Sequence, residues 1–194
     1  MTKIIGLTGG IGTGKTMVAE YFKSLGIPVY IADKEARQLM TSDNIINALS
    51  NEFGKEILEN GILNREKLAQ LVFNNPKKLQ KLNSIVHPEV KKHFDNWVEK
   101  HKNYPFVVKE AAILFESGSY KYCDTIITVT APLETRLQRV MKRDKTDRES
   151  VLKRIENQWT DEQRIAKSNY VIHNLSVEST KKQVDEILKK LKNQ

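Results

Sequence analysis

The stretch Gly9-Gly10-Ile11-Gly12-Thr13-Gly14-Lys15-Thr16 decides the fold of this chain. It matches the phosphate-binding pattern G-x-x-x-x-G-K-[ST] at each fixed position. A β-prone run at 3–8 precedes it, and Val18, Ala19 and Phe22 follow at helical spacing. A strand, a glycine-rich loop and a helix in this order predict a phosphate-binding loop.

Each residue type in this loop suits a phosphate chain. Glycines adopt positive φ and let backbone N–H groups surround phosphate oxygens, and the start of the next helix adds its positive dipole end. Lys15 would place a compact charge on the β- and γ-phosphates, and the Thr16 hydroxyl would bind Mg²⁺. The predicted ATP-binding residues are Gly9, Gly10, Gly12, Thr13, Gly14, Lys15, Thr16 and Met17, with Mg²⁺ as cofactor and Thr16 as its protein ligand.

The composition of the 194 residues predicts a soluble, cytoplasmic protein. Charged residues make up 29 %, and no apolar run reaches the roughly 18–20 residues that a membrane-spanning helix needs. The single cysteine, Cys123, excludes an internal disulfide. The net charge of +8 favours polyanionic partners, but no nucleic-acid-binding motif is present. We expect small phosphorylated partners, no nucleic acid, no membrane, and a monomer or weak homo-oligomer.

Short β-prone runs alternate with helical stretches, which predicts an α/β fold with a five-stranded parallel sheet in three layers. The expected core comprises about 1–32, 103–135 and 167–194, and its strands are 3–8, 28–31, 105–109, 125–130 and 169–173.

Two other segments would complete a single domain. Residues 33–102 are expected to be helical throughout, with Asn64 as an N-cap and with new helices opened by Pro76 and Pro88. Residues 136–166 are expected to form a lid. The lid region would consist of helices at 132–143 and 148–166 joined by a charged, mobile link at 144–147.

The rest of the chain favours a kinase over other nucleotide-dependent proteins. It contains neither the guanine-reading pattern N-K-x-D nor the switch pattern D-x-x-G, which a GTPase would carry. A motor ATPase would be longer and would have a strand ending in an acidic pair, whereas the third strand ends in Lys109-Glu110. A different small-molecule kinase and a non-catalytic switch or RNA-binding protein are the alternatives.

Asp33 and Arg37 follow the second strand, and ligands in open α/β sheets bind beyond the carboxyl ends of strands. Asp33 would accept the proton of an attacking hydroxyl as a catalytic residue, or it would cap the helix at 34–40. Arg37, one helical turn later, would hold an anionic acceptor or would be an ordinary surface arginine.

Arg136, Arg139 and Arg143 are spaced by three and four residues, which predicts one charged helix face opposite an apolar face with Leu133 and Leu137. Beside a mobile link, the arginines would close over ATP, surround the transferring group and exclude water. The alternative is a charged outer face without a role in catalysis.

His87 and Glu116 allow two interpretations each. His87 precedes Pro88 and has either a structural or a functional role. Glu116 follows an apolar run at 113–115, so it would lie near the metal or substrate, or would cap a helix.

Together these residues resemble the dephospho-coenzyme A kinase family over about 175 residues. The similar segments are IIGLTGGIGTGKT at 4–16, IPVYIAD at 27–33, Ala32-Asp33-x-x-Ala36-Arg37, NSIVHP at 83–88, ILFE at 113–116, Arg139-x-x-x-Arg143-Asp144, Ile155-x-x-Gln158 and Tyr170-Val171-Ile172-x-Asn174. The chain differs from the family at Ala111-Ala112, where a proline is common, at Lys109-Glu110, where an aspartate or apolar residue is common, and at Arg136, where a glutamine is common.

The resemblance implies transfer of the γ-phosphate of ATP to the 3′-hydroxyl of dephospho-CoA, which is the last step of coenzyme A biosynthesis. It implies a P-loop core, a helical acceptor-binding subdomain at 33–102 and a lid. The implied roles are catalysis for Asp33, Lys15, Arg139 and Arg143, and acceptor binding for Asp33, Arg37, His87 and Glu116.

Overall fold

A computed structural model describes residues 2–73 and 75–193, and the chain divides into two compact units. We call residues 1–31 with 101–194 the core unit, and residues 32–100 the helical unit.

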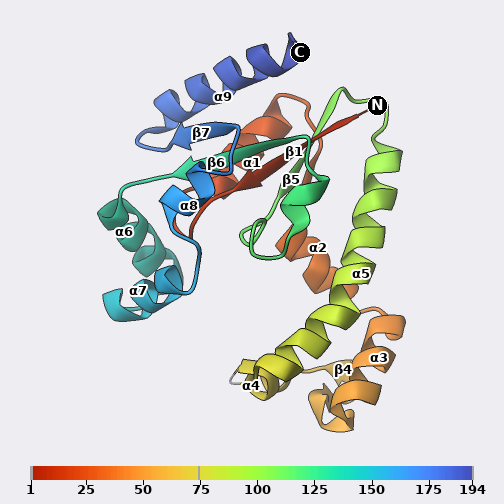
Figure 1. The fold of residues 1–194 in the computed structure, drawn as a ribbon. Coiled ribbons are helices and arrows are strands. Elements are labelled where there is room, and N and C mark those ends of the chain that lie inside the picture. The colour runs from red at the N-terminus through yellow and green to blue at the C-terminus, as the bar shows by residue number, and fades with distance from the viewer. Residues whose placement is uncertain (1, 74, 194) are drawn as a thin grey trace. The chain divides into compact units, whose positions relative to one another are not determined.

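The core unit is built on a five-stranded parallel sheet (Figure 1). Its strands are β1 (Lys3–Thr8), β2 (Val29–Ile31), β5 (Phe106–Glu110), β6 (Thr125–Thr130) and β7 (Tyr170–His173). The strand order is β2-β5-β1-β6-β7, and every adjacent pair is parallel. This order confirms the predicted α/β fold with its five parallel strands. The apolar runs of the central strands suit a sheet that is covered on both faces.

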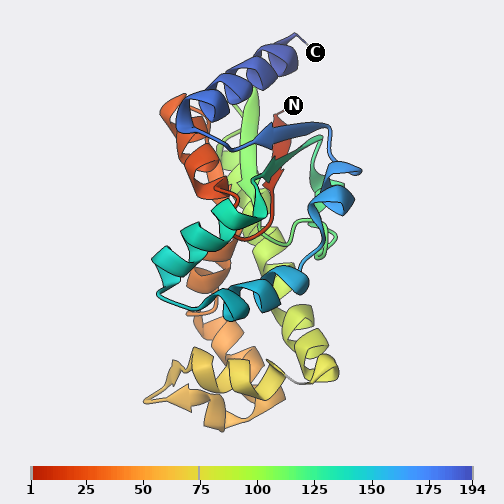
Figure 2. The same ribbon diagram turned by 90° about the vertical axis from the view of Figure 1, so that its left-hand side faces the viewer.

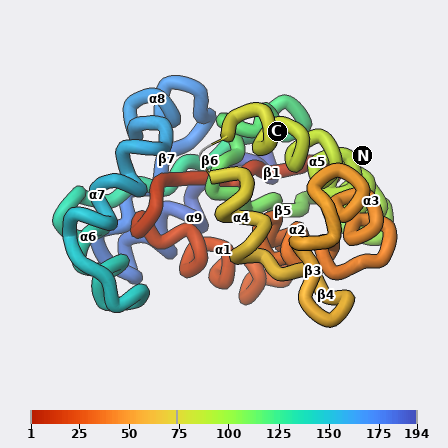
Figure 3. Tube along the Cα trace, turned by 90° about the horizontal axis from the view of Figure 1, so that it is seen from below, coloured from red at the N-terminus to blue at the C-terminus, as the bar shows by residue number. Residues whose placement is uncertain are grey.

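Helices cover both faces of this sheet. The helices α1 (Lys15–Ser24) and α9 (Val177–Lys192) lie on one side, and the short helices α8 (Asp161–Ile165) and η2 (Ser119–Tyr122) lie on the other (Figure 3). One apolar core joins α1, α9 and the strands, with Phe22, Ile127 and Val184 fully buried. The helices α6 (Leu133–Asp144) and α7 (Arg148–Glu156) form a hairpin beside the sheet (Figure 2).

The expected single helix at 148–166 is wrong, because α7 ends at Glu156 and α8 begins at Asp161. Thr160 starts the new helix through a capping box. Its hydroxyl accepts from the Gln163 amide at 3.3 Å, and its own amide donates to Gln163 Oε1 at 2.8 Å. A threonine followed three residues later by glutamine is a helix start signal, and here it outweighs helix continuation.

The expected faces of α6 are also wrong at two positions. Leu133 is 46 % exposed, whereas Arg136, expected on the charged face opposite the apolar one, is buried. The first turn of α6 packs on the loop after β1, and that loop offers backbone carbonyls, which suit a guanidinium better than a leucine.

Four helices form most of the helical unit. They are α2 (Ala32–Leu39), α3 (Asp43–Phe53), α4 (Arg65–Phe73) and α5 (Pro76–Lys100), with the 3₁₀ helix η1 (Lys55–Ile57) after α3. Their apolar side chains share a separate core around Leu49, Phe53 and Leu68. Asn64 caps α4 as predicted, since its Oδ1 accepts from the amides of Glu66 at 3.1 Å and Lys67 at 3.0 Å.

Two predictions for the helical unit are wrong. This unit contains a small antiparallel hairpin, β3 (Leu58–Glu59) and β4 (Ile62–Leu63), whose turn residues Asn60 and Gly61 have φ of 52° and 80°. An Asn-Gly pair favours this tight turn. Pro88 does not open a helix but lies inside α5, which continues on both sides because Val86 and Phe94 remain packed in the apolar interior.

Within the part of the chain that the structure describes, no helix has the length and apolar character needed to cross a membrane.

Candidate active site

The loop between β1 and α1, which we call the P-loop (Gly9–Thr16), has a backbone that only glycine fits at several positions, among them Gly12 and Gly14. Gly12 and Gly14 have φ of 80° and 94°. A Cβ added to Gly12 would lie 2.7 Å from the Arg136 carbonyl oxygen, and one added to Gly14 would lie 2.0 Å from Asn174 Nδ2. Both backbone conformation and space therefore require glycine at these positions.

Lys15 and Thr13 turn their polar atoms onto the start of the P-loop. Lys15 Nζ donates to the carbonyl oxygens of Gly9 at 2.8 Å and Gly10 at 3.3 Å. The buried Thr13 hydroxyl donates to the same Gly10 oxygen at 2.9 Å. The ammonium charge is thus held at the loop, and the exposed Thr16 follows as the second residue of α1.

Asn174 anchors the P-loop from the segment after β7. Its Nδ2 donates to the Thr13 carbonyl at 2.8 Å, and its Oδ1 accepts from the Thr180 hydroxyl at 3.0 Å. Asn174 is only 3 % exposed, so these bonds form out of water. The sequence placed Asn174 in a segment similar to the family but gave it no site role. The signal that the sequence offered was an asparagine directly after the predicted strand at 169–173.

Two of the three arginines of α6 contact the P-loop. Arg139 Nη1 donates to the Gly12 and Thr13 carbonyls, both at 3.4 Å, and Arg136 Nε donates to the Ile11 carbonyl at 2.9 Å. Arg136 was one of the three arginines expected to close over ATP, but the resemblance to the family implied no role for it.

Arg143, the third arginine, is 62 % exposed near the end of α6. There its Nε donates to Asp144 Oδ1 at 2.7 Å. This guanidinium, followed by that of Arg154, holds the pKa of the Asp144 carboxyl below its usual range. Arg143 is thus paired within the α6–α7 hairpin and does not contact the P-loop, so its role near the ATP phosphates stays a prediction.

The segment that links α7 to α8 also reaches the P-loop. Gln158 Oε1 accepts from the Ile11 amide at 2.9 Å. The next residue, Trp159, donates its amide to Glu116 Oε1 at 3.2 Å, and Arg164 Nη2 donates to the same oxygen at 3.1 Å. Burial lowers the pKa of the Arg164 guanidinium, and the Glu116 carboxylate opposes that shift. One oxygen of Glu116 is therefore already bound within the core unit.

The remaining candidates belong to the helical unit. Asp33 and Arg37 are exposed and lie four residues apart in α2, and His87 is exposed in α5. Because α2 already begins at Ala32, Asp33 lies in its first turn, and the alternative of an N-cap for a helix at 34–40 is wrong. Among the described residues of this unit, none forms a hydrogen bond or ion pair with the side chains of Asp33 and Arg37. Their roles stay predictions.

A parallel sheet has a phosphate-binding loop after its central strand, and arginines of a later helix donate to that loop. This arrangement defines the class of P-loop kinases. The family model described as Dephospho-CoA kinase matches residues 3–179 of this chain. The chain belongs to the dephospho-CoA kinase family.

Curated relatives agree with the family match. A dephospho-CoA kinase from Fusobacterium nucleatum is 41 % identical over 174 residues, which cover 89 % of this chain and 90 % of the relative. One from Bacteroides fragilis strain YCH46 is 37 % identical, covering 88 % of this chain and 83 % of the relative.

Solved structures show how far the fold is shared. The crystal structure of TT1252 from Thermus thermophilus superposes with a TM-score of 0.89 at 34 % identity, covering 98 % of each chain. A shikimate kinase from Acinetobacter baumannii superposes with a TM-score of 0.57 at 14 % identity, covering 100 % of this chain and 96 % of that one. The second likeness concerns the fold alone.

Proposed function

We propose that this chain transfers the γ-phosphoryl group of ATP to the 3′-hydroxyl of dephospho-CoA, the last step of coenzyme A biosynthesis. The observation that carries the proposal is a complete P-loop, with the Lys15 ammonium held on it, in a chain whose family match spans 3–179. Phosphoryl transfer needs positioning and charge stabilisation more than covalent chemistry, and this loop is suited to supply both.

In this proposal the core unit handles ATP. Lys15 stabilises the negative charge that develops on the transferring group, and the P-loop amides bind the phosphate oxygens. Arg139 adds a second cation near the loop, because its guanidinium already lies against Gly12. Arg143 would join it if residues 136–166 act as a lid, which requires its pair with Asp144 to open.

The acceptor would be handled by the helical unit, as an acceptor-binding subdomain. Asp33 accepts the proton of the 3′-hydroxyl and directs its attack, while Arg37 and His87 bind the anionic part of dephospho-CoA. Glu116, from the core unit, would also contact the acceptor. Only its Oε2 is left for that contact, because Oε1 already accepts from Arg164 and Trp159.

Mg²⁺ completes the proposal, and the residues near the P-loop fit it. Thr16 offers a hydroxyl at the start of α1, and Glu110 offers a carboxylate at the end of β5, which pairs with β1. Among the described residues, no group of three or more His, Cys, Asp or Glu side chains could hold a metal by itself. This suits Mg²⁺, which in such sites relies mainly on phosphates and water and neutralises charge on the transferring group.

The direct test is an assay of the purified protein with Mg²⁺, ATP and one acceptor per reaction, with ADP and product followed by mass spectrometry. Dephospho-CoA is expected to give ADP and CoA, whereas shikimate and adenosine give neither. ADP formed with another acceptor would keep the P-loop kinase but reject the substrate. No ADP with any acceptor would favour the nucleotide-dependent switch or RNA-binding alternative.

The proposal extends to the state of the protein in the cell. We expect it to work in the cytoplasm as a monomer or weak homo-oligomer, without nucleic acid. Light scattering during size-exclusion chromatography across a range of concentrations measures the oligomeric state, and a stable larger assembly would contradict this part.

A further inference from the structure

Four charged side chains of the core unit are linked by ion pairs into a row that leads away from the P-loop, and we call this row the charge chain. None of its ion pairs has a part in the reaction proposed above. Arg136 Nη1 lies 3.3 Å from Asp161 Oδ2, and Asp161 Oδ1 lies 3.7 Å from Arg164 Nη1. Arg164 Nη2 lies 3.1 Å from Glu116 Oε1. The charge chain therefore joins α6, α8 and the turn after β5.

This charge chain is largely buried. The Arg136 side chain is 8 % exposed and that of Arg164 is fully buried, while the two carboxylates are about one-fifth exposed. Removing such charges from water costs several kcal/mol per ion, so buried pairs are weak evidence for added stability. The cost is also incompletely offset, because Arg164 Nε is buried without a hydrogen-bond partner among the described residues. A positional role accounts for the arrangement better than stability does.

At one end the charge chain meets the peptide groups of Ile11 in the P-loop. The Ile11 carbonyl accepts from Arg136 Nε at 2.9 Å, and the Ile11 amide donates to Gln158 Oε1 at 2.9 Å. Both polar backbone groups of Ile11 are thus occupied by side chains from the segment 136–158. Ile11 is an anchor point of the loop, and its amide is not available to a phosphate oxygen.

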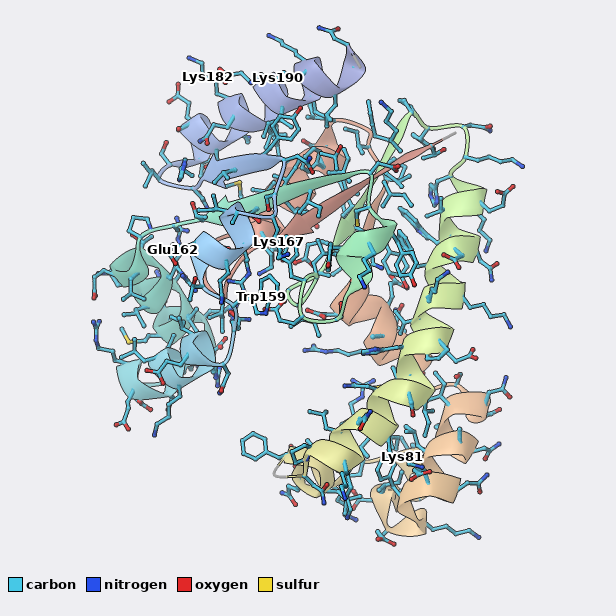
Figure 4. All side chains as sticks on the ribbon, viewed as in Figure 1. Lys81, Trp159, Glu162, Lys167, Lys182 and Lys190 are labelled. Carbon is cyan, nitrogen blue, oxygen red and sulfur yellow. The ribbon has the colours of Figure 1, made fainter. Side chains whose placement is uncertain are left out.

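At the other end of the charge chain, Glu116 and Phe115 hold the link between α7 and α8 (residues 157–160), which also carries Gln158. The rings of Phe115 and Trp159 stack with their centroids 5.4 Å apart and their planes within 2°. Trp159 lies in the link before α8 (Figure 4), and its carbonyl also accepts from Arg164 Nη1. The link that carries Gln158 is therefore fixed by groups that belong to the charge chain or adjoin it.

We propose that Asp161 and Arg164 are positioning residues for phosphoryl transfer. Through Arg136 and the link at 157–160, they hold both peptide groups of Ile11, and so fix the curvature of the P-loop that receives the phosphates. A displacement of about 1 Å at a reacting group can cost roughly 100-fold in rate, so such support matters even far from the chemistry.

The test compares two charge removals in the first turn of α8. Asp161→Asn breaks the pair with Arg136, whereas Glu162→Gln removes the neighbouring, exposed carboxylate (Figure 4). Asp161→Asn is expected to weaken ATP binding about tenfold by calorimetry and to raise the KM for ATP, with the KM for dephospho-CoA unchanged. Glu162→Gln is expected to leave all three unchanged. Loss of structure alone would not affect one substrate selectively.

A double-mutant cycle adds a second readout. If Arg136 and Asp161 act as a unit, Arg136→Gln combined with Asp161→Asn binds ATP no more weakly than the worse single variant. Equal ATP affinity in Asp161→Asn and Glu162→Gln, or additive losses in the cycle, would overturn the inference. Should Asp161→Asn fail to fold, Arg164→Lys replaces it, because an ammonium keeps the charge but loses the fork that reaches Glu116 and Trp159 together.

The inference rests on the proposed function only for its kinetic readouts. ATP binding is measured without an acceptor, so a wrong acceptor would leave the binding comparison intact. A failed binding comparison would in turn leave CoA formation by the unaltered protein intact.

Discussion

The P-loop and the helical unit hold their candidate residues in opposite ways. In the P-loop, Lys15 and Thr13 already donate to loop carbonyls, and Asn174 donates to the Thr13 carbonyl from the segment after β7. In the helical unit, Asp33 and Arg37 are exposed, and their side chains form no hydrogen bond or ion pair with that unit's described residues. The difference indicates two ways to build a binding site. Under the proposed roles, backbone that is fixed in advance would bind the phosphate chain, whereas exposed side chains would bind the acceptor.

The largest effect is expected for Asp33→Asn, which tests the proposed role of an exposed side chain of the helical unit. The amide keeps the shape but cannot accept the proton of the 3′-hydroxyl, so turnover should fall by roughly 10²–10⁴-fold, the usual size of a general-base contribution. ATP affinity should stay the same, because the proposed role of Asp33 is toward the acceptor. Steady-state rates and ATP calorimetry measure the two effects. The matched control is Asp43→Asn, an exposed aspartate in the first turn of α3. Turnover close to that of the unaltered protein would reject the base assignment.

Lys15→Ala is expected to have the next largest effect and a different signature. It removes the cation that the P-loop holds, so turnover should fall by about 10²–10³-fold, in the range found when one charge-stabilising donor is lost. ATP affinity should fall as well, which separates Lys15 from Asp33. Lys23→Ala, near the exposed end of α1, serves as control. Slower turnover with ATP affinity intact would mean that Lys15 acts on the phosphates only in the transition state, and unchanged turnover would reject its catalytic role.

Asn174→Ala tests whether the P-loop is preorganised. Truncation leaves the Thr13 carbonyl and the Thr180 hydroxyl without this partner, at a cost of about 1–3 kcal/mol for buried polar groups. We expect lower stability to denaturant and a loss of ATP affinity of about tenfold or less. Asn193→Ala, at the exposed end of α9, should change neither. Full ATP affinity in a destabilised Asn174→Ala would mean that the loop holds its shape by itself.

Asn174 also shows where sequence reasoning stops. The P-loop, the five strands and the Asn64 cap could be predicted because their signals lie within a few residues of one another. Asn174 contacts a residue 161 positions earlier, and Arg136 contacts one 125 positions earlier. Such contacts depend on how the sheet is ordered, and spacing along the chain does not encode it. Arg136 was therefore expected on the helix face opposite the apolar one, whereas it is buried against the loop.

Other misses had a local signal that was outweighed. Asn60-Gly61 marks a tight hairpin, but its strands are two residues long, shorter than the runs by which strands are recognised. Thr160 and Gln163 form a capping box inside what reads as one helical stretch. Pro88 has the residue type of a helix start, yet packing on both sides carries α5 through it. At the hairpin and the capping box, local chemistry outweighed the simpler helical pattern, whereas at Pro88 tertiary packing outweighed a local signal.

The smallest expected effect concerns the helical unit alone. Asn64→Ala removes the cap of α4, whose Oδ1 accepts from two backbone amides, and should lower stability by about 1 kcal/mol. Asn47→Ala, inside α3 and exposed, is a matched change that should be neutral or slightly stabilising because alanine favours helix. Denaturant unfolding measures both, and hydrogen exchange of residues 65–73 locates the loss. ATP affinity should not change in either variant. If Asn64→Ala weakened ATP binding as Asn174→Ala does, the two units would not be energetically separate, and the contrast between a preorganised loop and a free acceptor side would fail.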